Sequence, residues 1–181
     1  MLNKSLVIVG RDTRPSGETL VAAFTDGVNS MSGNVHDYGI LTTPQLHYLT
    51  KCKNDSEYGE PTIDGYNTKL SDAFNSLMAT NGSFEKIKIK VDCANGVGAP
   101  AMVPFQKIKN GAEFELLNVG IDNANLLNLN CGADYVKTQQ KAPDGVVVNV
   151  GDLWCSFDGD ADRIVFFYSD QGKFFWSVCC I

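Results

Sequence analysis

The chain has 181 residues, which suffices for one sizeable hydrophobic core or two small units. Apolar residues make up 44% and charged residues 20% of the sequence, a balance that excludes a disordered or collagen-like chain. The net charge of −6, with no basic run longer than the alternating Lys86, Lys88 and Lys90, argues against nucleic-acid binding.

Neither a membrane span nor a secretion signal is predicted. No stretch approaches the roughly 18 consecutive apolar residues that a membrane-spanning helix needs. The first apolar run, residues 6–9, is interrupted by Gly10, Arg11 and Asp12 too early for a signal-peptide core. The six cysteines are scattered without a Cys-x-x-Cys pair, which is typical of reduced thiols. We therefore expect a cytoplasmic protein that does not bind membranes.

The first third of the chain alternates between strand and helix patterns. Residues 6–9 predict a fully buried strand. A helix is expected from near Ser16, which can cap it, to about Ser32, and residues 35–38 predict a second short strand. The pair Thr43-Pro44 then opens a second helix. This β-α-β-α order is typical of an α/β fold with a mostly parallel sheet flanked by helices.

A polar stretch, residues 54–65, is the expected boundary between two units that span residues 1–60 and 61–181. The remaining patterns predict helices over residues 62–79, from about 98 to 109 and over 133–140, and strands over 87–91, 113–117, 154–157 and 164–168, with a hairpin turn at 169–172. Both units are therefore expected to have α/β architecture with mixed, mostly parallel sheets.

The two ends of the chain are strand-like and apolar. Natural domains usually end on polar surface segments, because an exposed apolar strand edge invites aggregation. The final segment, residues 173–181, is strongly apolar. We therefore expect the chain to be a fragment of a larger protein, with both units incomplete, and to self-associate through its apolar ends.

Three carboxylates lie within five residues in the loop that follows the predicted strand 154–157. They are Asp158, Asp160 and Asp162. Two unit charges about 6 Å apart at an effective dielectric constant near 20 repel by roughly 3 kcal/mol, so the cluster requires a compensating cation. A hard divalent ion with oxygen ligands supplies that charge. The spacing therefore predicts a metal site, and the alternative is a solvated acidic turn.

Two other metal-dependent classes of protein also carry closely spaced aspartates in a loop. An EF-hand would carry Gly at the sixth position and Glu at the twelfth, where this chain has Arg163 and Ser169, so that class is excluded. A haloacid-dehalogenase-type phosphatase would carry Asp-x-Asp-x-Thr or Val after a strand. The segment 160–164 is only a near match, because Ile164 has no hydroxyl group, and this class stays open as an alternative.

Five further motifs occur together with the Asp-Gly-Asp-Ala-Asp-Arg loop. In chain order they are residues 10–16 (GRDTRPS), 36–39 (HDYG), 41–48 (LTTPQLHY), 91–96 (VDCANG) and 131–137 (CGADYVK). The set resembles the α-D-phosphohexomutase superfamily and, within it, the phosphoacetylglucosamine mutase family, from about Leu6 to Phe174. On this resemblance, residues 1–60 correspond to the later part of domain 1, and residues 61–181 to a truncated domain 2 that carries the metal loop.

The resemblance implies a magnesium-dependent isomerase that interconverts N-acetylglucosamine 6-phosphate and N-acetylglucosamine 1-phosphate, on the route to UDP-N-acetylglucosamine. Asp158, Asp160 and Asp162 would hold Mg²⁺, and a phosphorylated N-acetylhexosamine would be the partner of the complete enzyme. Arg163 would support catalysis by reaching the phosphoryl group or the phosphoserine. The alternative for Arg163 is a plain ion pair with the aspartates.

The sequence also departs from the family. The family donates its phosphoryl group from a phosphoserine in a Thr-Ala-Ser-His-Asn-Pro loop, and this chain contains no Ser-His-Asn-Pro. The tail 176–181 replaces a segment where Asp-Gly-Asp is expected. The isolated chain is therefore predicted to be inactive, and a non-catalytic Mg²⁺-binding or regulatory fragment stays open as an alternative.

Two smaller groups of residues have both a functional and a structural interpretation. Arg11, Asp12 and Arg14 follow the first strand, where they would either bind phosphate or brace the loop through an Arg–Asp pair. Residues 92–98 lead from a strand into a helix, and a tight structural turn is favoured there over a ligand-binding loop.

Overall fold

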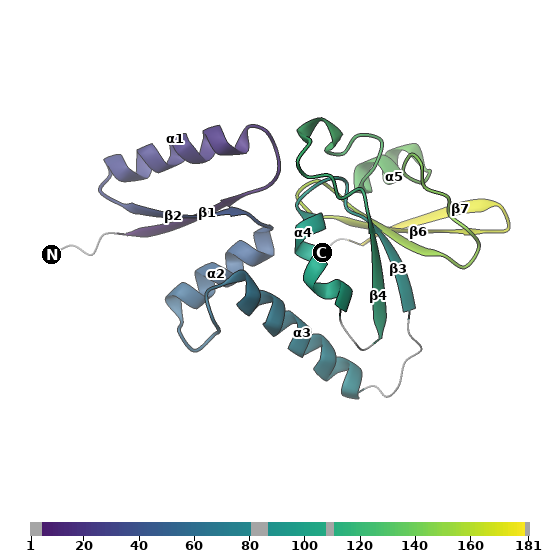
Figure 1. Cartoon of the computed structure of the whole chain (residues 1–181), viewed down its shortest axis with the longest axis horizontal. Coiled ribbons are helices and arrows are strands. Elements are labelled where there is room, and N and C mark those ends of the chain that lie inside the picture. The colour runs from purple at the N-terminus through teal and green to yellow at the C-terminus, as the bar shows by residue number, and fades with distance from the viewer. Residues whose placement is uncertain (1–4, 81–86, 108–110, 180–181) are drawn as a thin grey trace.

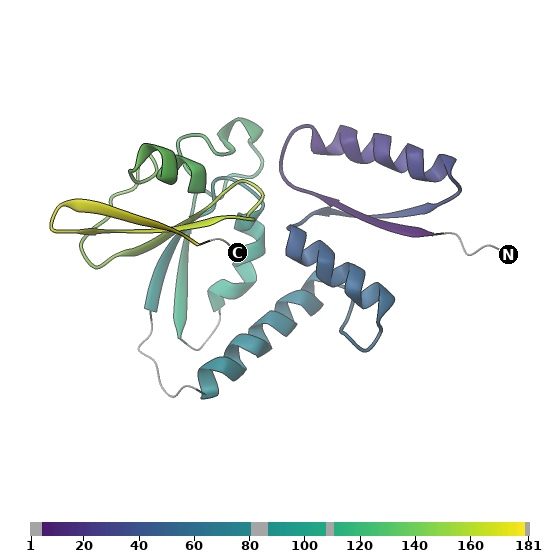
Figure 2. The same cartoon turned by 180° about the vertical axis from the view of Figure 1, so that it is seen from behind.

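The computed structural model describes residues 5–80, 87–107 and 111–179 (Figure 1). It contains a two-stranded sheet and a five-stranded sheet, which lie at opposite ends of the molecule (Figure 2). Helices pack against both sheets, which confirms the predicted α/β class with mixed, mostly parallel sheets. No described helix combines the length and the apolar character needed to cross a membrane.

The first unit is built on two parallel strands, β1 (Leu6–Arg11) and β2 (Asn34–Ile40), which pair along their length. The intervening helix α1 (Gly17–Ser30) lies along one face of this sheet (Figure 1). The chain then continues into α2 (Thr43–Asn54) and α3 (Ile63–Thr80). Every element expected in this part of the sequence is present, although α1 ends two residues earlier than expected.

The prediction that residues 6–9 form a fully buried strand is wrong. Leu6 is 51% exposed, and Val7, Ile8 and Val9 are only partly buried. The reason is the width of the sheet: β1 and β2 are its two strands, α1 covers one face, and α2 lies beneath one end of the other (Figures 1 and 2). An apolar run predicts burial only where both faces of its sheet are covered.

Helices α2 and α3 form a small core of their own. Pro44 stands in the first turn of α2, and the backbone N–H of Thr42 donates to the side-chain oxygen of Gln45 at 2.9 Å, which closes the helix start. Leu49 is fully buried, and the rings of Tyr48 and Tyr66 meet edge to face at 5.5 Å. These contacts hold α2 against α3, the helix from which the chain continues towards the five-stranded sheet.

The second unit is a five-stranded sheet with the order β4-β3-β5-β6-β7. Strands β4, β3 and β5 run parallel, whereas β5, β6 and β7 are antiparallel. The elements are β3 (Ile87–Asp92), α4 (Gly98–Met102), the 3₁₀ helix η1 (Val103–Lys107), β4 (Ala112–Leu117), the 3₁₀ turn η2 (Ala124–Leu126), α5 (Ala133–Gln139), β5 (Leu153–Phe157), β6 (Ile164–Asp170) and β7 (Lys173–Cys179).

Both faces of the five-stranded sheet are covered. On one face, Val136 of α5 packs with Trp154 and Phe167 of the sheet, and all three are buried. On the other face, Ala99 of α4 packs with Cys155. Neighbouring residues of β5 therefore contribute to different cores, because successive side chains of a strand point to opposite faces. This two-sided packing fixes the end of β5, where the acidic loop begins.

Two local expectations for the second unit have different outcomes. The helix expected to reach residue 109 ends at Met102 and continues as the 3₁₀ helix η1, since Pro104 has no N–H with which to continue the α-helical hydrogen bonds. The hairpin turn at 169–172 is confirmed. Gln171 and Gly172 have φ values of 47° and 75°, as a tight two-residue turn between antiparallel strands requires.

One ion pair ties the start of β5 to β3 and predicts a pH-dependent stability. Lys90 Nζ lies 2.9 Å from Asp152 Oδ2, which also accepts from the backbone N–H of Asn149 at 3.0 Å. These contacts lower the pKa of Asp152 from 3.8 to about 2. As the pH falls from 3.8 towards 2, the unfolded chain takes up a proton before the folded chain does, so the stabilisation is complete above 3.8 and is lost across this interval.

We expect the Asp152→Asn substitution to lower the free energy of unfolding by about 1–2 kcal/mol at pH 7. The difference from wild type should shrink as the pH is lowered towards 2. Urea unfolding followed by circular dichroism at a series of pH values measures it. Asp170→Asn, at an exposed position of the β6–β7 hairpin, is the matched control and should behave as wild type. A difference that stays constant with pH would contradict this assignment.

Candidate metal centre

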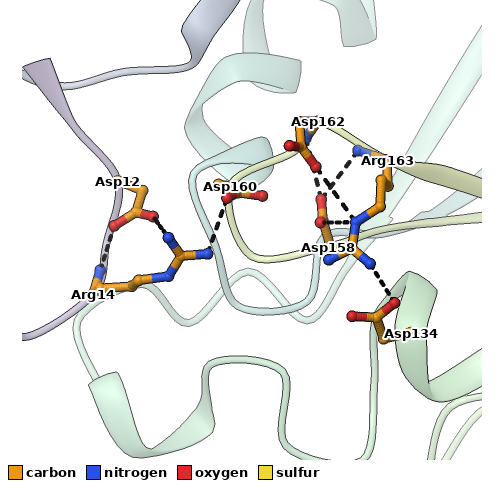
Figure 3. A network of polar contacts seen from close by, with 7 residues as sticks. All are labelled: Asp12, Arg14, Asp134, Asp158, Asp160, Asp162 and Arg163. Atoms are coloured by element: carbon orange, nitrogen blue, oxygen red, sulfur yellow. Dashed lines mark hydrogen bonds and ion pairs between the residues drawn. The ribbon is translucent and has the colours of Figure 1, made fainter. Parts of the chain in front are cut away.

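The acidic loop connects β5 to β6 at an end of the five-stranded sheet. Asp158, Asp160 and Asp162 each offer a carboxylate oxygen, and these oxygens lie within 4.8 Å of one another. Asp158 is buried, Asp160 is partly buried and Asp162 is exposed. Alternate residues of the loop therefore converge, as the spacing predicts (Figure 3).

Asp158 shapes the loop. Its Oδ1 accepts hydrogen bonds from the backbone N–H groups of Asp162 and Arg163, at 3.1 and 3.2 Å. Its own carbonyl oxygen accepts from the N–H of Ala161, which has a left-handed φ of 57°. These hydrogen bonds turn the backbone of the loop back on itself. The carboxylates of Asp158 and Asp162 therefore lie close together.

Asp160 divides its two carboxylate oxygens between different environments. Oδ2 accepts a hydrogen bond from Arg14 Nη2 at 2.9 Å, and Arg14 comes from the loop between β1 and α1 in the first unit (Figure 3). Oδ1 is buried and has no hydrogen-bond partner. A buried carboxylate oxygen without a donor is costly, so it marks a position that a cation can fill.

Arg163 lies against the aspartates. Its Nε is 2.6 Å from Asp158 Oδ2 and 3.4 Å from Asp162 Oδ1, and its Nη1 donates to Asp134 in the first turn of α5. Of the two interpretations of Arg163, the structure shows the ion pair; contact with a phosphoryl group stays a prediction. Asp134 was missed as a site residue, although it lies within the motif 131–137.

Burial and neighbouring charges shift the pKa values of the loop residues in different directions. Burial raises the pKa of Asp158, and the charge of Asp160 adds to that effect. Burial is the largest influence on Asp160 and by itself would raise its pKa, but the hydrogen bond and charge of Arg14, together with the interaction with Asp158, outweigh burial and lower that pKa. Burial would lower the pKa of Arg163, yet its bonds to Asp158 and Asp134 raise it. The loop thus gathers negative charge that two arginines offset only in part.

The loop at residues 92–98 packs directly against the backbone of the acidic loop. The N–H of Val97 donates to the carbonyl oxygen of Gly159 at 3.1 Å, and a Cβ on Gly96 would lie 2.3 Å from that same oxygen. Only glycine allows the two backbones to approach so closely. The structure therefore favours the structural interpretation of residues 92–98, as a turn that packs against the acidic loop.

Asp92, at the end of β3, holds the loop at residues 92–98 and the start of α5 in place. Its side chain is fully buried and accepts four hydrogen bonds, two on each oxygen. The donors are Ala94 N (3.0 Å), Asn118 Nδ2 (2.8 Å), Gly132 N (2.7 Å) and Ser156 Oγ (2.6 Å). Asp92 thereby joins the ends of β3, β4 and β5 to the start of α5, which places Asp134 beside Arg163.

Arg11, at the end of β1, and Asp12 and Arg14, which follow it, form ion pairs with other residues of the chain. Arg11 Nη2 lies 2.9 Å from Glu18 Oε1, and Arg14 Nη1 lies 3.0 Å from Asp12 Oδ2. Asp12 Oδ1 also accepts from the backbone N–H of Arg14 at 2.9 Å. The loop-bracing interpretation of this group is therefore seen, together with a bridge to Asp160 that the sequence did not reveal.

A cavity of about 730 Å³ adjoins the acidic loop. It lies between α2 and α3 and is lined by His47, Lys51, Tyr66 and Lys69, with Asp162 at its edge. A mostly apolar and aromatic cavity with a few polar side chains in its wall is typical of ligand sites. The donor set of the loop itself consists of carboxylate oxygens, which suits a hard cation such as Mg²⁺.

Two family models match the chain. The model described as phosphoacetylglucosamine mutase AMG1, domain II, matches residues 60–165, and the model described as phosphoglucomutase/phosphomannomutase, alpha/beta/alpha domain I, matches residues 1–59. Human phosphoacetylglucosamine mutase is 46% identical over 175 residues, which cover 94% of this chain and 32% of the human protein. The Saccharomyces cerevisiae enzyme is 38% identical, with 93% and 33% covered.

Solved structures agree with these relatives. The N-acetylphosphoglucosamine mutase of Aspergillus fumigatus, in complex with GlcNAc-6P and magnesium, matches with a TM-score of 0.86 and 39% identity, covering 98% of this chain and 36% of that one. A substrate complex of an N-acetylglucosamine-phosphate mutase matches with a TM-score of 0.86 and 42% identity, covering 96% and 33%.

The fold and these matches thus place the chain in the α-D-phosphohexomutase superfamily. The sequence identity of 46% to human phosphoacetylglucosamine mutase, over 94% of this chain, identifies the family within that superfamily. The chain belongs to the phosphoacetylglucosamine mutase family. It spans about a third of the length of the curated relatives that it matches.

Proposed function

We propose that this chain supplies the cation-binding part of a phosphoacetylglucosamine mutase, an isomerase that interconverts N-acetylglucosamine 6-phosphate and N-acetylglucosamine 1-phosphate. Family membership supports the proposal, as does the magnesium present in the related Aspergillus complex with GlcNAc-6P. In this proposal residues 1–60 belong to the first domain and residues 61–181 to the second, and a phosphorylated N-acetylhexosamine is the partner of the complete enzyme.

Asp158, Asp160 and Asp162 are the proposed ligands of Mg²⁺. The ion would supply positive charge that stabilises the oxygens of a transferring phosphoryl group. Asp158 orients the loop through its bonds to the backbone, and Asp160 directs one buried oxygen towards the cluster. Arg163, which is 51% exposed, holds its guanidinium beside the cluster and keeps N–H groups available on the solvent side for a phosphate.

The observation that carries the proposal is the convergence of three carboxylates around the unpartnered Oδ1 of Asp160. An ordinary acidic turn would leave its oxygens to water. Here one oxygen is removed from solvent without receiving a donor, which costs free energy unless a ligand compensates.

Calorimetric titration of the chain with Mn²⁺ or Mg²⁺ tests this site. We expect wild type to bind one divalent ion, and Asp160→Asn to bind it about tenfold more weakly or worse, because the substitution removes one ligand charge at nearly constant volume. Asp170→Asn makes the same chemical change on an exposed residue of the same sheet and should leave the affinity unchanged. Equal affinities for wild type and Asp160→Asn would contradict the proposed site.

A further inference from the structure

The contact between Arg14 and Asp160 joins two parts of the chain that are 146 residues apart in sequence. Arg14 belongs to the β1–α1 loop of the first unit, whereas Asp160 belongs to the acidic loop of the second. Figure 3 shows the guanidinium between the carboxylates of Asp12 and Asp160. Each carboxylate receives a different nitrogen of the same planar group, at 3.0 and 2.9 Å.

We propose that Arg14 is a positioning residue for the cation, and that it acts by fixing the orientation of the Asp160 carboxylate. This inference rests on the proposed metal centre. Arg14 occupies Oδ2 and leaves Oδ1 buried and unpartnered, so a cation binds Asp160 without displacing the arginine. A ligating carboxylate whose other oxygen is held by a fixed donor loses less freedom when the metal binds.

Asp12 holds Arg14 in this position. Its Oδ2 pairs with Nη1, and its Oδ1 accepts the backbone N–H of Arg14 at 2.9 Å, so both the side chain and the backbone of Arg14 are constrained. A guanidinium serves this role because its fork has a fixed geometry, which one lysine ammonium does not reproduce. The geometry of the cation site therefore depends on the first unit as well as the second.

The charge of Arg14 acts in the opposite direction, because a positive group repels a cation. The side chain is 55% exposed and already paired with Asp12, so solvent and that carboxylate screen the repulsion. Loss of the groups that orient metal ligands typically weakens metal binding by about 10- to 100-fold. Positioning is thus the larger effect, and removal of Arg14 weakens binding.

The test compares Mn²⁺ affinity by calorimetry for wild type, Arg14→Met and Arg14→Lys, with Arg11→Met as the matched control. Arg11 is the last residue of β1, three positions before Arg14, and makes an ion pair of the same length, but to Glu18. We expect Arg14→Met to bind about tenfold more weakly. Arg14→Lys keeps the charge but not the fork and should bind about threefold more weakly. Arg11→Met should bind as wild type does.

Thermal unfolding provides a second readout. The Arg14 side chain is more than half exposed and lysine keeps its charge, so Arg14→Lys should melt near wild type in EDTA but show a smaller rise in Tm on adding Mn²⁺. Tighter or unchanged binding by Arg14→Met would overturn the inference, and so would unchanged binding by Arg14→Lys. Absence of Mn²⁺ binding in wild type would overturn the proposed metal centre itself, which distinguishes the two failures.

Discussion

Purified chain incubated with N-acetylglucosamine 6-phosphate and Mg²⁺ is expected to form no N-acetylglucosamine 1-phosphate above background. The phosphoryl donor of the family is a phosphoserine in a Ser-His-Asn-Pro loop, and the two histidines of this chain, His36 and His47, are followed by Asp37 and Tyr48. A metal centre without a phosphoryl carrier has no group to transfer. The expected loss relative to a complete enzyme is therefore total.

A coupled assay that consumes N-acetylglucosamine 1-phosphate measures this, with the Aspergillus fumigatus enzyme as the positive control. Trace mutase from the expression host is the main source of false turnover. The Asp160→Asn variant, purified in the same way, carries the same contamination without the intact acidic loop. Turnover by wild type that disappears in Asp160→Asn would contradict the prediction, whereas turnover shared by both belongs to the host.

Replacement of Asp92 by Ala is expected to lower the free energy of unfolding by about 3–5 kcal/mol. The substitution removes a fully buried carboxylate and leaves four donors without an acceptor: Ala94 N, Asn118 Nδ2, Gly132 N and Ser156 Oγ. A buried donor without an acceptor retains its desolvation cost, which is the main source of the loss. Chemical denaturation followed by tryptophan fluorescence measures the change, since Trp154 is buried in the same unit.

Two variants show whether the hydrogen bonds cause the loss. Asp92→Asn keeps the volume and one acceptor oxygen but directs an NH₂ group at two of the donors. It should therefore lower the free energy of unfolding measurably, but by less than Asp92→Ala does. Asp122→Ala, at an exposed position, should stay within about 0.5 kcal/mol of wild type. A small effect of Asp92→Ala would mean that water replaces the carboxylate.

The sequence by itself determined the local parts of this protein. The helices α2 and α3, the hairpin turn at Gln171-Gly172 and the Asp-x-Asp-x-Asp loop all follow from residues within one or two turns of each other. Periodicity, capping and turn chemistry act over that range, so the same residues select the same local structure in many folds. The resemblance to phosphohexomutases rests on such short motifs and is confirmed by the family models.

Only the tertiary structure decided which of these residues meet. Arg14 reaches Asp160 and Arg163 reaches Asp134 because the β1–α1 loop, the β5–β6 loop and α5 pack together. The periodicity of a sequence carries no information about contacts between residues so far apart in the chain. The exposure of Leu6 has the same origin, since an apolar side chain is buried only if another element covers it. Local chemistry therefore predicts which side chains can bind a cation, whereas long-range packing decides how they are held.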